Sequence, residues 1–495
     1  MDAIQKTATH LRADSAVRQP VRRSLPREGL WIGLVMALAT CLPVFVAVHP
    51  QLTDYPAHLA RYHVMLEIGR NADLARFYTF AWQWTGNLGV DLLMRLFAPL
   101  FGLEAAGRAI VAAIPVLTGL AILTVEWTLR RRIGAGALFA FTFIWSPTLL
   151  MGLSNFGLSL ALALFAFALW VRLAEWRWRA ALFVPIGVVV WLCHVSGWGI
   201  LGIIVFGYEW HRRKGLRAFV APWPLMLPFL SPLLASKVAG GISWGANVQV
   251  YKIGILLQTM RDRNYDLDMV SLIVVLLLLA AAVWARRFDG RLGWGALIVF
   301  VGALLMPRHI FGGDYADYRM ISSALMLAFL AVDCPAPRWA LWCAPLLFAV
   351  RLTVTTQAWH DESRQLEHML RALDHVPQGA RVASGIGLVR GGWRINPFEH
   401  VCGYAVVRRD ALSNCNFALP GVHMLGLRQA GFTDPSQRIF LRRGQAADLA
   451  AFAPARGMDY LWYVGRPPVG RLPAGARVVY RAPGTLLARL AKPAP

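Results

Sequence analysis

The apolar residues of this chain are gathered in long blocks separated by short polar turns. The blocks lie at residues 30–48, 108–129, 135–151, 156–171, 181–194, 198–209, 222–236, 269–284, 293–306, 320–332 and 339–356. A helix needs about 20 apolar residues to cross the hydrocarbon core of a bilayer, and several blocks are shorter than this. We therefore expect about eleven transmembrane helices, some of them tilted, re-entrant or broken.

The charges between the blocks predict an orientation. Basic residues are concentrated in a tail at 1–29 and in turns at 130–132, 172–179, 212–214 and 286–291. Because cytoplasmic loops carry an excess of Lys and Arg, these segments are expected on the cytoplasmic side. The first block lacks a small-residue cleavage site, which indicates an uncleaved anchor rather than a signal peptide. An odd number of crossings then places the C-terminal region on the outer side.

Composition supports a polytopic α-helical membrane protein. Hydrophobic residues make up 57% of the 495 residues and charged residues only 16%, which is too apolar for a soluble protein of this size. The formal net charge of +23 would suggest nucleic acid as a partner of a soluble protein. Here much of the excess follows the positive-inside pattern, so we exclude nucleic acid as a partner.

Hydropathy falls after the last block, which divides the chain into a tail at 1–29, a transmembrane domain at 30–357 and a soluble domain at 358–495. The soluble domain reads as a small α/β or α+β unit with a helix at 362–373 and strands at 380–384, 404–407, 460–464 and 476–480. Cys402 and Cys415 both lie in it and are candidates for a disulfide in an oxidising compartment. The four other cysteines lie in or near apolar blocks.

The first outer loop, 51–106, opens with the sequence that we place at the centre of the active site. Asp54 can cap a helix, and Pro56 suits its first turn. Asp54, His58 and Arg61 follow at spacings of four and three, so one helix face would carry a carboxylate, an imidazole and a guanidinium, a set capable of acid/base chemistry. The alternative is that Asp54 only caps the helix while His58 and Arg61 face lipid headgroups.

The rest of this loop mixes aromatic and charged residues, a pattern typical of helices that lie in the membrane interface. Residues 86–91 open a second amphipathic helix with a second candidate carboxylate, Asp91, whose alternative role is a cap or a surface charge. His194 leaves an apolar block on the same side. It either lines the site or, as we favour, packs at a helix end.

Two later outer loops carry charge against the positive-inside pattern. In the loop 237–268, Lys237 and Arg261 suggest binding of an anionic headgroup or lipid phosphate, and the alternative is a solvated loop of paired Arg and Asp. The loop 307–319 contains five further candidates for substrate binding, and so much charge beside a bilayer is costly unless it is paired or functional. These are Arg308, His309, Asp314, Asp317 and Arg319.

Arg319 begins an apolar block and can bind a phosphate in a bidentate manner. The alternative for this loop is a structural network of ion pairs. The chain has no zinc-ligand spacing, P-loop, dinucleotide fingerprint, GxSxG elbow or sustained repeat.

The order of tail, first span, acidic first outer loop, many further spans and C-terminal outer domain resembles the GT-C superfamily of integral-membrane glycosyltransferases. It is similar to the protein O-mannosyltransferase and aminoarabinose transferase type. In that superfamily an acidic residue of the first outer loop is a catalytic base or a metal ligand, and Asp54 in Asp54-Tyr55-Pro56 matches it by position. The family's common form is a pair of adjacent acids, whereas here Tyr55 follows Asp54.

The resemblance implies transfer of a sugar from a polyprenyl-phosphate donor to a lipid, glycan or protein acceptor at the outer face of a membrane, such as a bacterial inner membrane with the C-terminal domain in the periplasm. Asp54 would be the base, while His58, Arg61 and Asp91 would orient sugar or acceptor. The leaving phosphate would be stabilised by Arg308 and Arg319, with Lys237 or Arg261 as further cations.

A divalent metal, Mg or Mn, would require Asp54 together with Asp91, Asp314 or Asp317, and the spacing leaves this open. Two other functions also stay open. One is a noncatalytic protein of surface-polysaccharide assembly; the other is a lipid or glycan transporter, which would more often place charges inside spans and show related halves.

Overall fold

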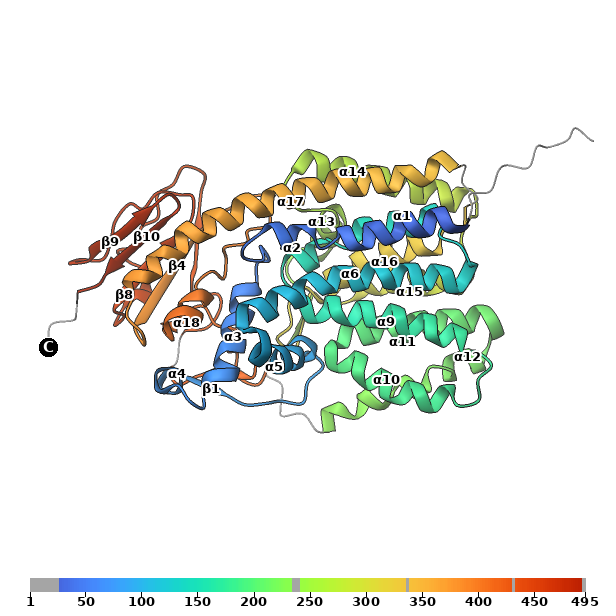
Figure 1. The fold of residues 1–495 in the computed structure, drawn as a ribbon, viewed down its shortest axis with the longest axis horizontal. Coiled ribbons are helices and arrows are strands. Elements are labelled where there is room, and N and C mark those ends of the chain that lie inside the picture. Colours follow the sequence, from blue (N-terminus) through green and yellow to red (C-terminus); the bar gives the residue numbers. More distant parts are fainter. Residues whose placement is uncertain (1–25, 234–240, 335–337, 430–431, 492–495) are drawn as a thin grey trace, which may run out of the picture.

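A computed structural model describes residues 26–233, 241–334, 338–429 and 432–491 of the chain. Helices form an elongated bundle, and a sheet domain lies at one end of it (Figure 1). The helix α17 (Cys343–Leu370) runs from the bundle into the sheet domain and links the two parts. The predicted combination of a helical body with a smaller C-terminal α/β domain is therefore present.

Within the described residues, five helical stretches are long and apolar enough to cross a membrane. They are Arg27–Val46, Leu103–Arg130, Ser154–Arg172, Tyr265–Trp284 and Ala340–His375. Shorter apolar helical stretches lie at Ala135–Leu150, Arg179–Cys193, Val248–Leu257 and Gly290–Leu305. These lengths and compositions fit a membrane protein, with fewer full-length candidates than the eleven apolar blocks.

The bundle is built from helices that pack along one another. α1 (Pro26–Ala39) lies on α6 (Leu103–Arg130), which packs against α9 (Ser154–Arg172). α10 (Arg179–Cys193) and α11 (Val195–Arg213) follow, and α11 packs on α15 (Gly290–Leu305). α14 (Tyr265–Trp284) and α16 (Ala316–Ala331) complete the set, with α16 packed on α15. Their buried faces form one continuous apolar core.

Proline accounts for two differences from the predicted spans. The block 135–151 is broken into α7 (Ala135–Ala140), a 3-10 turn and α8 (Pro147–Leu150), because Pro147 favours an extended conformation at Ser146, where ψ is 161°. The block 222–236 is not an α-helix as far as residue 233. It forms 3-10 turns at Trp223–Leu225 and Leu227–Leu233, since its closely spaced prolines remove the N–H groups that an α-helix needs.

The loop predicted at 237–268 contains a strand and helices from residue 242 on. Ile242–Ser243 (β2) pairs with His309–Ile310 (β3), and α13 (Val248–Leu257) follows. The short helix α12 (Leu216–Val220) precedes this region, and α2 (Leu42–Val46) continues the first span beyond a break at Cys41.

The first outer loop is largely folded into α3 (Tyr55–Glu67), α4 (Ala72–Phe77), β1 (Tyr78–Phe80) and α5 (Gly89–Phe101). α3 starts with Pro56 in its first turn, as predicted, but packs between α6 and the sheet domain and is buried on most sides. α5 instead exposes Leu92, Leu96 and Leu100. Of these helices, α5 is therefore the one whose exposed face fits the interface of a membrane.

The sheet domain has the strand order β5-β4-β8-β10-β9, with β7 also paired to β4. The strands are β4 (Arg381–Val389), β5 (Leu412–Ser413), β7 (Arg438–Leu441), β8 (Tyr460–Val464), β9 (Arg477–Ala482) and β10 (Thr485–Arg489). β5, β7 and β8 run parallel to β4, whereas β10 runs antiparallel to β8 and β9. A separate strand, β6 (Leu425–Leu427), pairs with β1 and ties this domain to the first outer loop.

The predicted strand at 404–407 is wrong, because these residues belong to the helix α18 (Gly403–Arg409). β-Branched residues favour a strand here, but α18 is fixed by its packing on α3. The strand predicted at 460–464 is confirmed, and those at 380–384 and 476–480 overlap β4 and β9. The disulfide between Cys402 and Cys415 is confirmed.

The contact of α18 with α3 requires a glycine. A Cβ atom at Gly403 would lie 2.2 Å from the Pro56 carbonyl oxygen, which belongs to the backbone and cannot move aside cheaply. We expect Gly403→Ala to destabilise the protein by about 1–3 kcal/mol, as overpacking does in a filled core. Thermal unfolding of the two purified proteins measures this change, with Gly69→Ala as a control because nothing lies near a Cβ at that position. Equal stability of G403A and wild type would contradict the prediction.

Candidate active site

Asp54 lies at the start of α3, where the first outer loop meets the bundle. Its backbone N–H donates to the Met151 carbonyl oxygen at 2.9 Å, and Gly152 lies directly against it. Asp54 occupies the N-cap position, but its side chain makes no capping hydrogen bond. The alternative that Asp54 serves only as a cap is therefore wrong, and its carboxylate is available for another use.

The sheet domain brings a histidine to this carboxylate. His400 Nε2 lies 3.6 Å from Asp54 Oδ1 and 3.8 Å from Asp434 Oδ1, and the His400 side chain is buried. The Gln437 amide donates to Asp434 Oδ1 at 2.9 Å. His400 is thus placed between two carboxylates that are more than 300 positions apart in the sequence.

Arg438 carries the positive charge of this group. It forms ion pairs with Glu399 at 2.5 Å and with Asp434 at 3.5 Å. Glu399, Asp434 and Arg438 are each partly exposed, so this side of the site is open to water. Asp54 has no Arg or Lys within ion-pair distance in the part of the chain that the structure describes.

The surroundings of Asp54 raise its pKa well above the usual value. Burial is the largest cause, followed by the negative charges of Glu399 and Asp434, while Arg438 and Arg319 act in the opposite direction. Burial also lowers the pKa of His400, against the attraction of Asp434 and Glu399. The site therefore contains the uncharged imidazole of His400 beside the carboxyl group of Asp54, whose basicity is raised. This arrangement suits proton transfer near neutral pH.

A wall of aromatic rings adjoins this pair. The Phe417 ring centroid lies 5.3 Å from that of His58, 4.8 Å from that of His400 and 5.8 Å from that of His423. Burial lowers the pKa of His58 well below its usual value and that of His423 to about 4, so both imidazoles are neutral at pH 7. The structure therefore places His58 beside Phe417, as part of an uncharged aromatic surface next to His400.

The bundle contributes Arg319 from the first turn of α16. Its guanidinium donates to the Asp314 carbonyl oxygen at 3.1 Å and lies 3.3 Å from His194 Nε2. Among the described residues no carboxylate lies within ion-pair distance of Arg319, and its Nε atom is buried without a hydrogen-bond partner. His194 caps α11 through Nδ1, which accepts from the Ser196 N–H, so it both packs at a helix end and borders Arg319.

Arg61 and Asp91 are paired with each other. Arg61 lies 2.9 Å from Asp91, and both side chains are buried. The Asn155 side chain binds the backbone at the start of α5, since it accepts from the Val90 N–H and donates to the Asn87 carbonyl oxygen. Asp91 is therefore neither a cap nor a surface charge, and both groups of the pair are already neutralised.

The loop 307–319 also contains ion pairs. Arg308 binds Asp314 with two hydrogen bonds of 2.9 Å. Asp317 is fully buried and pairs with Lys252 at 2.6 Å. His309 lies in β3 and is paired with Ser243 of β2. The alternative of a structural ion-pair loop fits Arg308, Asp314 and Asp317, but among the described residues neither His309 nor Arg319 has an ion-pair partner.

Arg261 and Arg263 connect the bundle to the sheet domain. Arg261 donates to the carbonyl oxygens of Trp393 and Gly392, and Arg263 pairs with Asp262 and Glu362. The paired-loop alternative therefore fits Arg263. Lys237 lies outside the described residues.

The carboxylates proposed to join Asp54 in a metal site are each paired with the basic side chain of an Arg or a Lys. Asp91 binds Arg61, Asp314 binds Arg308, and Asp317 binds Lys252. Across the described ranges, no group of three or more His, Cys, Asp or Glu side chains is arranged to hold a metal ion.

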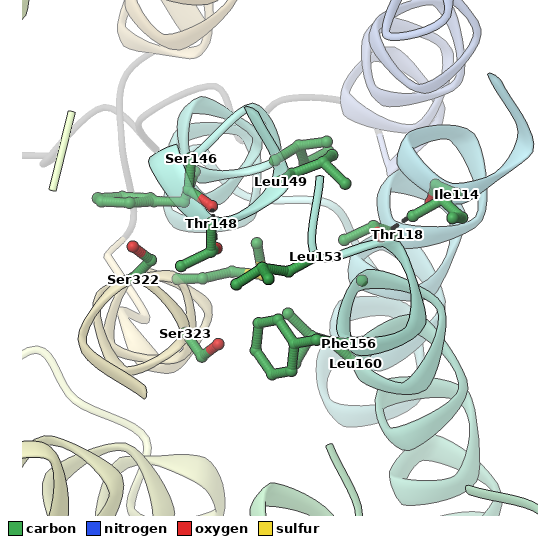
Figure 2. Close-up of a pocket in the computed structure, with 14 residues that line it drawn as sticks. Ile114, Thr118, Ser146, Thr148, Leu149, Leu153, Phe156, Leu160, Ser322 and Ser323 are labelled. Atoms are coloured by element: carbon green, nitrogen blue, oxygen red, sulfur yellow. Dashed lines mark hydrogen bonds between the residues drawn. The ribbon is translucent and has the colours of Figure 1, made fainter. Parts of the chain in front are cut away.

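A cavity lies inside the bundle between α6, α8, α9 and α16 (Figure 2). Phe143, Phe156, Leu160 and Met326 make its walls mostly apolar, and Ser146, Thr148, Ser322 and Ser323 add hydroxyl groups. Its volume of about 20 Å³ has room for a single water molecule. It is too small to bind a substrate and is not the active site.

Sequence reasoning missed the part of the site that the sheet domain supplies. Glu399, His400, Phe417, Asp434 and Arg438 lie in a soluble domain where charged and aromatic residues are ordinary, so no local pattern distinguishes them. No protein-family model matches the chain, and no curated protein sequence matches it either.

Proposed function

We propose that this protein is a membrane glycosyltransferase of the GT-C kind, which transfers a sugar from a polyprenyl-phosphate donor to an acceptor hydroxyl. The observation that carries this proposal is a pair of groups that act on each other electrostatically, the Asp54 carboxylate and the Arg319 guanidinium. Among the described residues, Asp54 has no Arg or Lys within ion-pair distance and Arg319 has no carboxylate within that distance. A base and a cation for a leaving phosphate are the two groups that this reaction needs.

Asp54 would act as the general base in its ionised form. The acceptor oxygen attacks the anomeric carbon of the sugar, its proton passes to Asp54, and the bond between that carbon and the phosphate oxygen breaks. The raised pKa of Asp54 makes it a stronger base than an ordinary aspartate. His400, 3.6 Å away, would orient the carboxylate.

Arg319 would stabilise the charge that develops on the leaving phosphate. The other proposed cations are less suited to this role, since Arg308 and Arg61 are neutralised by Asp314 and Asp91. A guanidinium at a bundle surface with little water is an effective partner for a phosphate oxygen.

His58, Phe417 and His423 would contact the sugar. Their rings are uncharged and partly exposed, and an apolar ring surface suits the C–H face of a pyranose while leaving its hydroxyl groups to the polar residues nearby. This arrangement requires no nucleotide-binding loop, in agreement with the absence of that motif from the sequence.

In this proposal the chain crosses a bacterial inner membrane about eleven times. Its N-terminus is cytoplasmic, and its sheet domain lies on the outer side of the membrane. The site then faces the compartment in which lipid-linked sugars meet lipid, glycan or protein acceptors. The disulfide between Cys402 and Cys415 fits an oxidising compartment of this kind.

A donor assay tests the proposed function. Purified protein in lipid nanodiscs is incubated with a panel of radiolabelled polyprenyl-phosphate sugars and candidate acceptors, and both labelled product and free polyprenyl phosphate are measured. We expect turnover with at least one donor and a strong loss in Arg319→Gln. No sugar release from any donor would instead favour a noncatalytic assembly protein.

The pH dependence of turnover gives an independent prediction. The negative charge of Glu399 raises the pKa of Asp54, so Glu399→Gln lowers this pKa. Because Asp54 must be ionised to accept a proton, the rise of activity with pH then begins at lower pH. Rates measured across the pH range for E399Q, wild type and the exposed control Asp374→Asn test this. A shift toward higher pH in E399Q would contradict the role of Asp54 as base.

A further inference from the structure

One end of the C-terminal sheet faces the helical bundle. α17 leaves the bundle, and after a turn at the far end of the domain β4 runs back toward it (Figure 1). β7 and β8 run parallel to β4, so the C-terminal ends of all three strands lie at this same end of the sheet. Residues that follow these strands are therefore brought together although they are far apart in the sequence.

Arginines follow each of the three strands. Arg390 comes directly after β4, Arg442 and Arg443 come after β7, and Arg466 comes after β8. All four side chains are exposed, and none forms an ion pair within the ranges that the structure describes. The segments 386–395, 439–447 and 464–470 contain no Asp or Glu, and the next carboxylate, Asp448, is paired with Arg471, so this end of the sheet has an excess of positive charge.

Exposed apolar side chains lie among these arginines. Phe440, at the end of β7, is 54% exposed, and Val389, at the end of β4, is 42% exposed on the opposite face of the sheet. The Arg390 guanidinium lies 5.8 Å from the centre of the Phe440 ring. An exposed aromatic ring beside unpaired arginines is typical of surfaces that bind the headgroup region of a membrane.

This end of the sheet is close to a membrane-spanning candidate. Trp393 follows Val389 by four residues, which span at most about 14 Å. The Trp393 ring packs edge-on against Tyr265, the first residue of α14, and its indole N–H donates to Asp268 in the same helix. Arg390, three residues before Trp393, therefore lies within about one to two Debye lengths of the first turn of α14.

We propose that Val389, Arg390, Phe440, Arg442, Arg443 and Arg466, here called the basic edge, rest on anionic phospholipid headgroups of the membrane that the bundle spans. The arginines neutralise lipid phosphates, and Phe440 enters the headgroup layer. This contact holds the sheet domain, and with it His400 and Glu399, at a fixed height above the bilayer. It does not depend on the proposed glycosyl transfer.

A spin label at position 440 tests this contact in the full-length protein. Phe440→Cys is made with Cys41, Cys193, Cys334 and Cys343 replaced by Ala and the disulfide retained, and the matched control carries the label at Val478→Cys. Val478 is also an exposed residue of the same sheet, at 43%, but lies in β9 near the end where β4 begins. Both proteins are placed in nanodiscs of phosphatidylcholine alone and of a mixture rich in phosphatidylglycerol.

The measurement is the ratio of collisions with oxygen, which enters lipid, to collisions with a water-soluble nickel chelate. We expect this ratio to be several-fold higher at position 440 than at position 478 in the phosphatidylglycerol mixture, and to fall in phosphatidylcholine. Arg442→Glu with Arg443→Glu should reduce the equilibrium constant for membrane docking of the sheet domain by about fivefold or more for each charge, whereas Arg477→Glu with Arg489→Glu should leave it unchanged.

Two results would overturn the proposal. One is a label at position 440 that is as accessible to the nickel chelate as the label at position 478 in both lipid mixtures. The other is immersion of position 440 that is equal in the two mixtures, because anionic headgroups would then not be the partner. Both comparisons use the labelled protein without charge reversal, so the test holds if the reversed variants fail to fold.

Discussion

Asp54→Asn is expected to lower sugar transfer by about 10²–10⁴-fold while leaving the fold intact. The substitution keeps the size and shape of the side chain but removes its ability to accept a proton. Because the Asp54 side chain makes no capping hydrogen bond, the start of α3 loses no cap. The same transfer assay with saturating donor measures the effect.

The stability of D54N is part of this prediction. The raised pKa of Asp54 means that the folded state disfavours its charged form, so the neutral amide should unfold at the same temperature as wild type or slightly higher. Glu67→Gln removes a charge from the other end of α3, where Glu67 pairs with Arg70, and should leave transfer unchanged. Full activity of D54N would remove Asp54 from the chemistry and favour a noncatalytic role for the chain.

Asp91→Asn is expected to destabilise the protein by about 3–5 kcal/mol, because it leaves the buried Arg61 without its partner. The matched control is Asp314→Asn, which breaks the pair with Arg308. Those two side chains are 36% and 41% exposed, and a pair with this exposure contributes at most about 1 kcal/mol. Thermal and chemical unfolding of the purified proteins measure both changes.

A double variant separates the charge effect from the packing effect. Arg61→Met with Asp91→Leu replaces the buried pair by apolar side chains and should recover much of the lost stability. If D91N instead retained wild-type stability and lost only transfer, Asp91 would be a substrate ligand, as its position in the first outer loop suggested, and its structural role would be wrong.

The helical body could be predicted from local patterns. The apolar blocks and the fall in hydropathy near residue 358 reflect the apolar environment that each segment needs, and this is a property of consecutive residues. Pro56 marked the first turn of α3 for the same reason. Prediction failed where local and tertiary preferences differ, as at residues 404–407, whose β-branched side chains form a helix because α18 packs on α3.

The candidate site was predicted only in part. Asp54, His58 and Arg319 were identified because each lies at the start of a helix beside an apolar block, where polar groups are conspicuous. Which charges remain free could not be predicted, because the ion pairs of Arg61 with Asp91 and of Lys252 with Asp317 join different helices. The carboxylates of these pairs look equivalent to Asp54 until the partners are known.

The sequence by itself determined a chain of apolar helices with a smaller C-terminal domain, a disulfide candidate in that domain, and an aspartate at the entrance of the first outer loop. Only the tertiary structure placed His400, Glu399 and Asp434 around that aspartate. It also paired the other candidate carboxylates with basic side chains and brought the arginines together at one end of the sheet. The physical reason is distance along the chain. Helix formation depends on neighbours within one or two turns, whereas the electrostatics of a site depend on residues that are hundreds of positions apart.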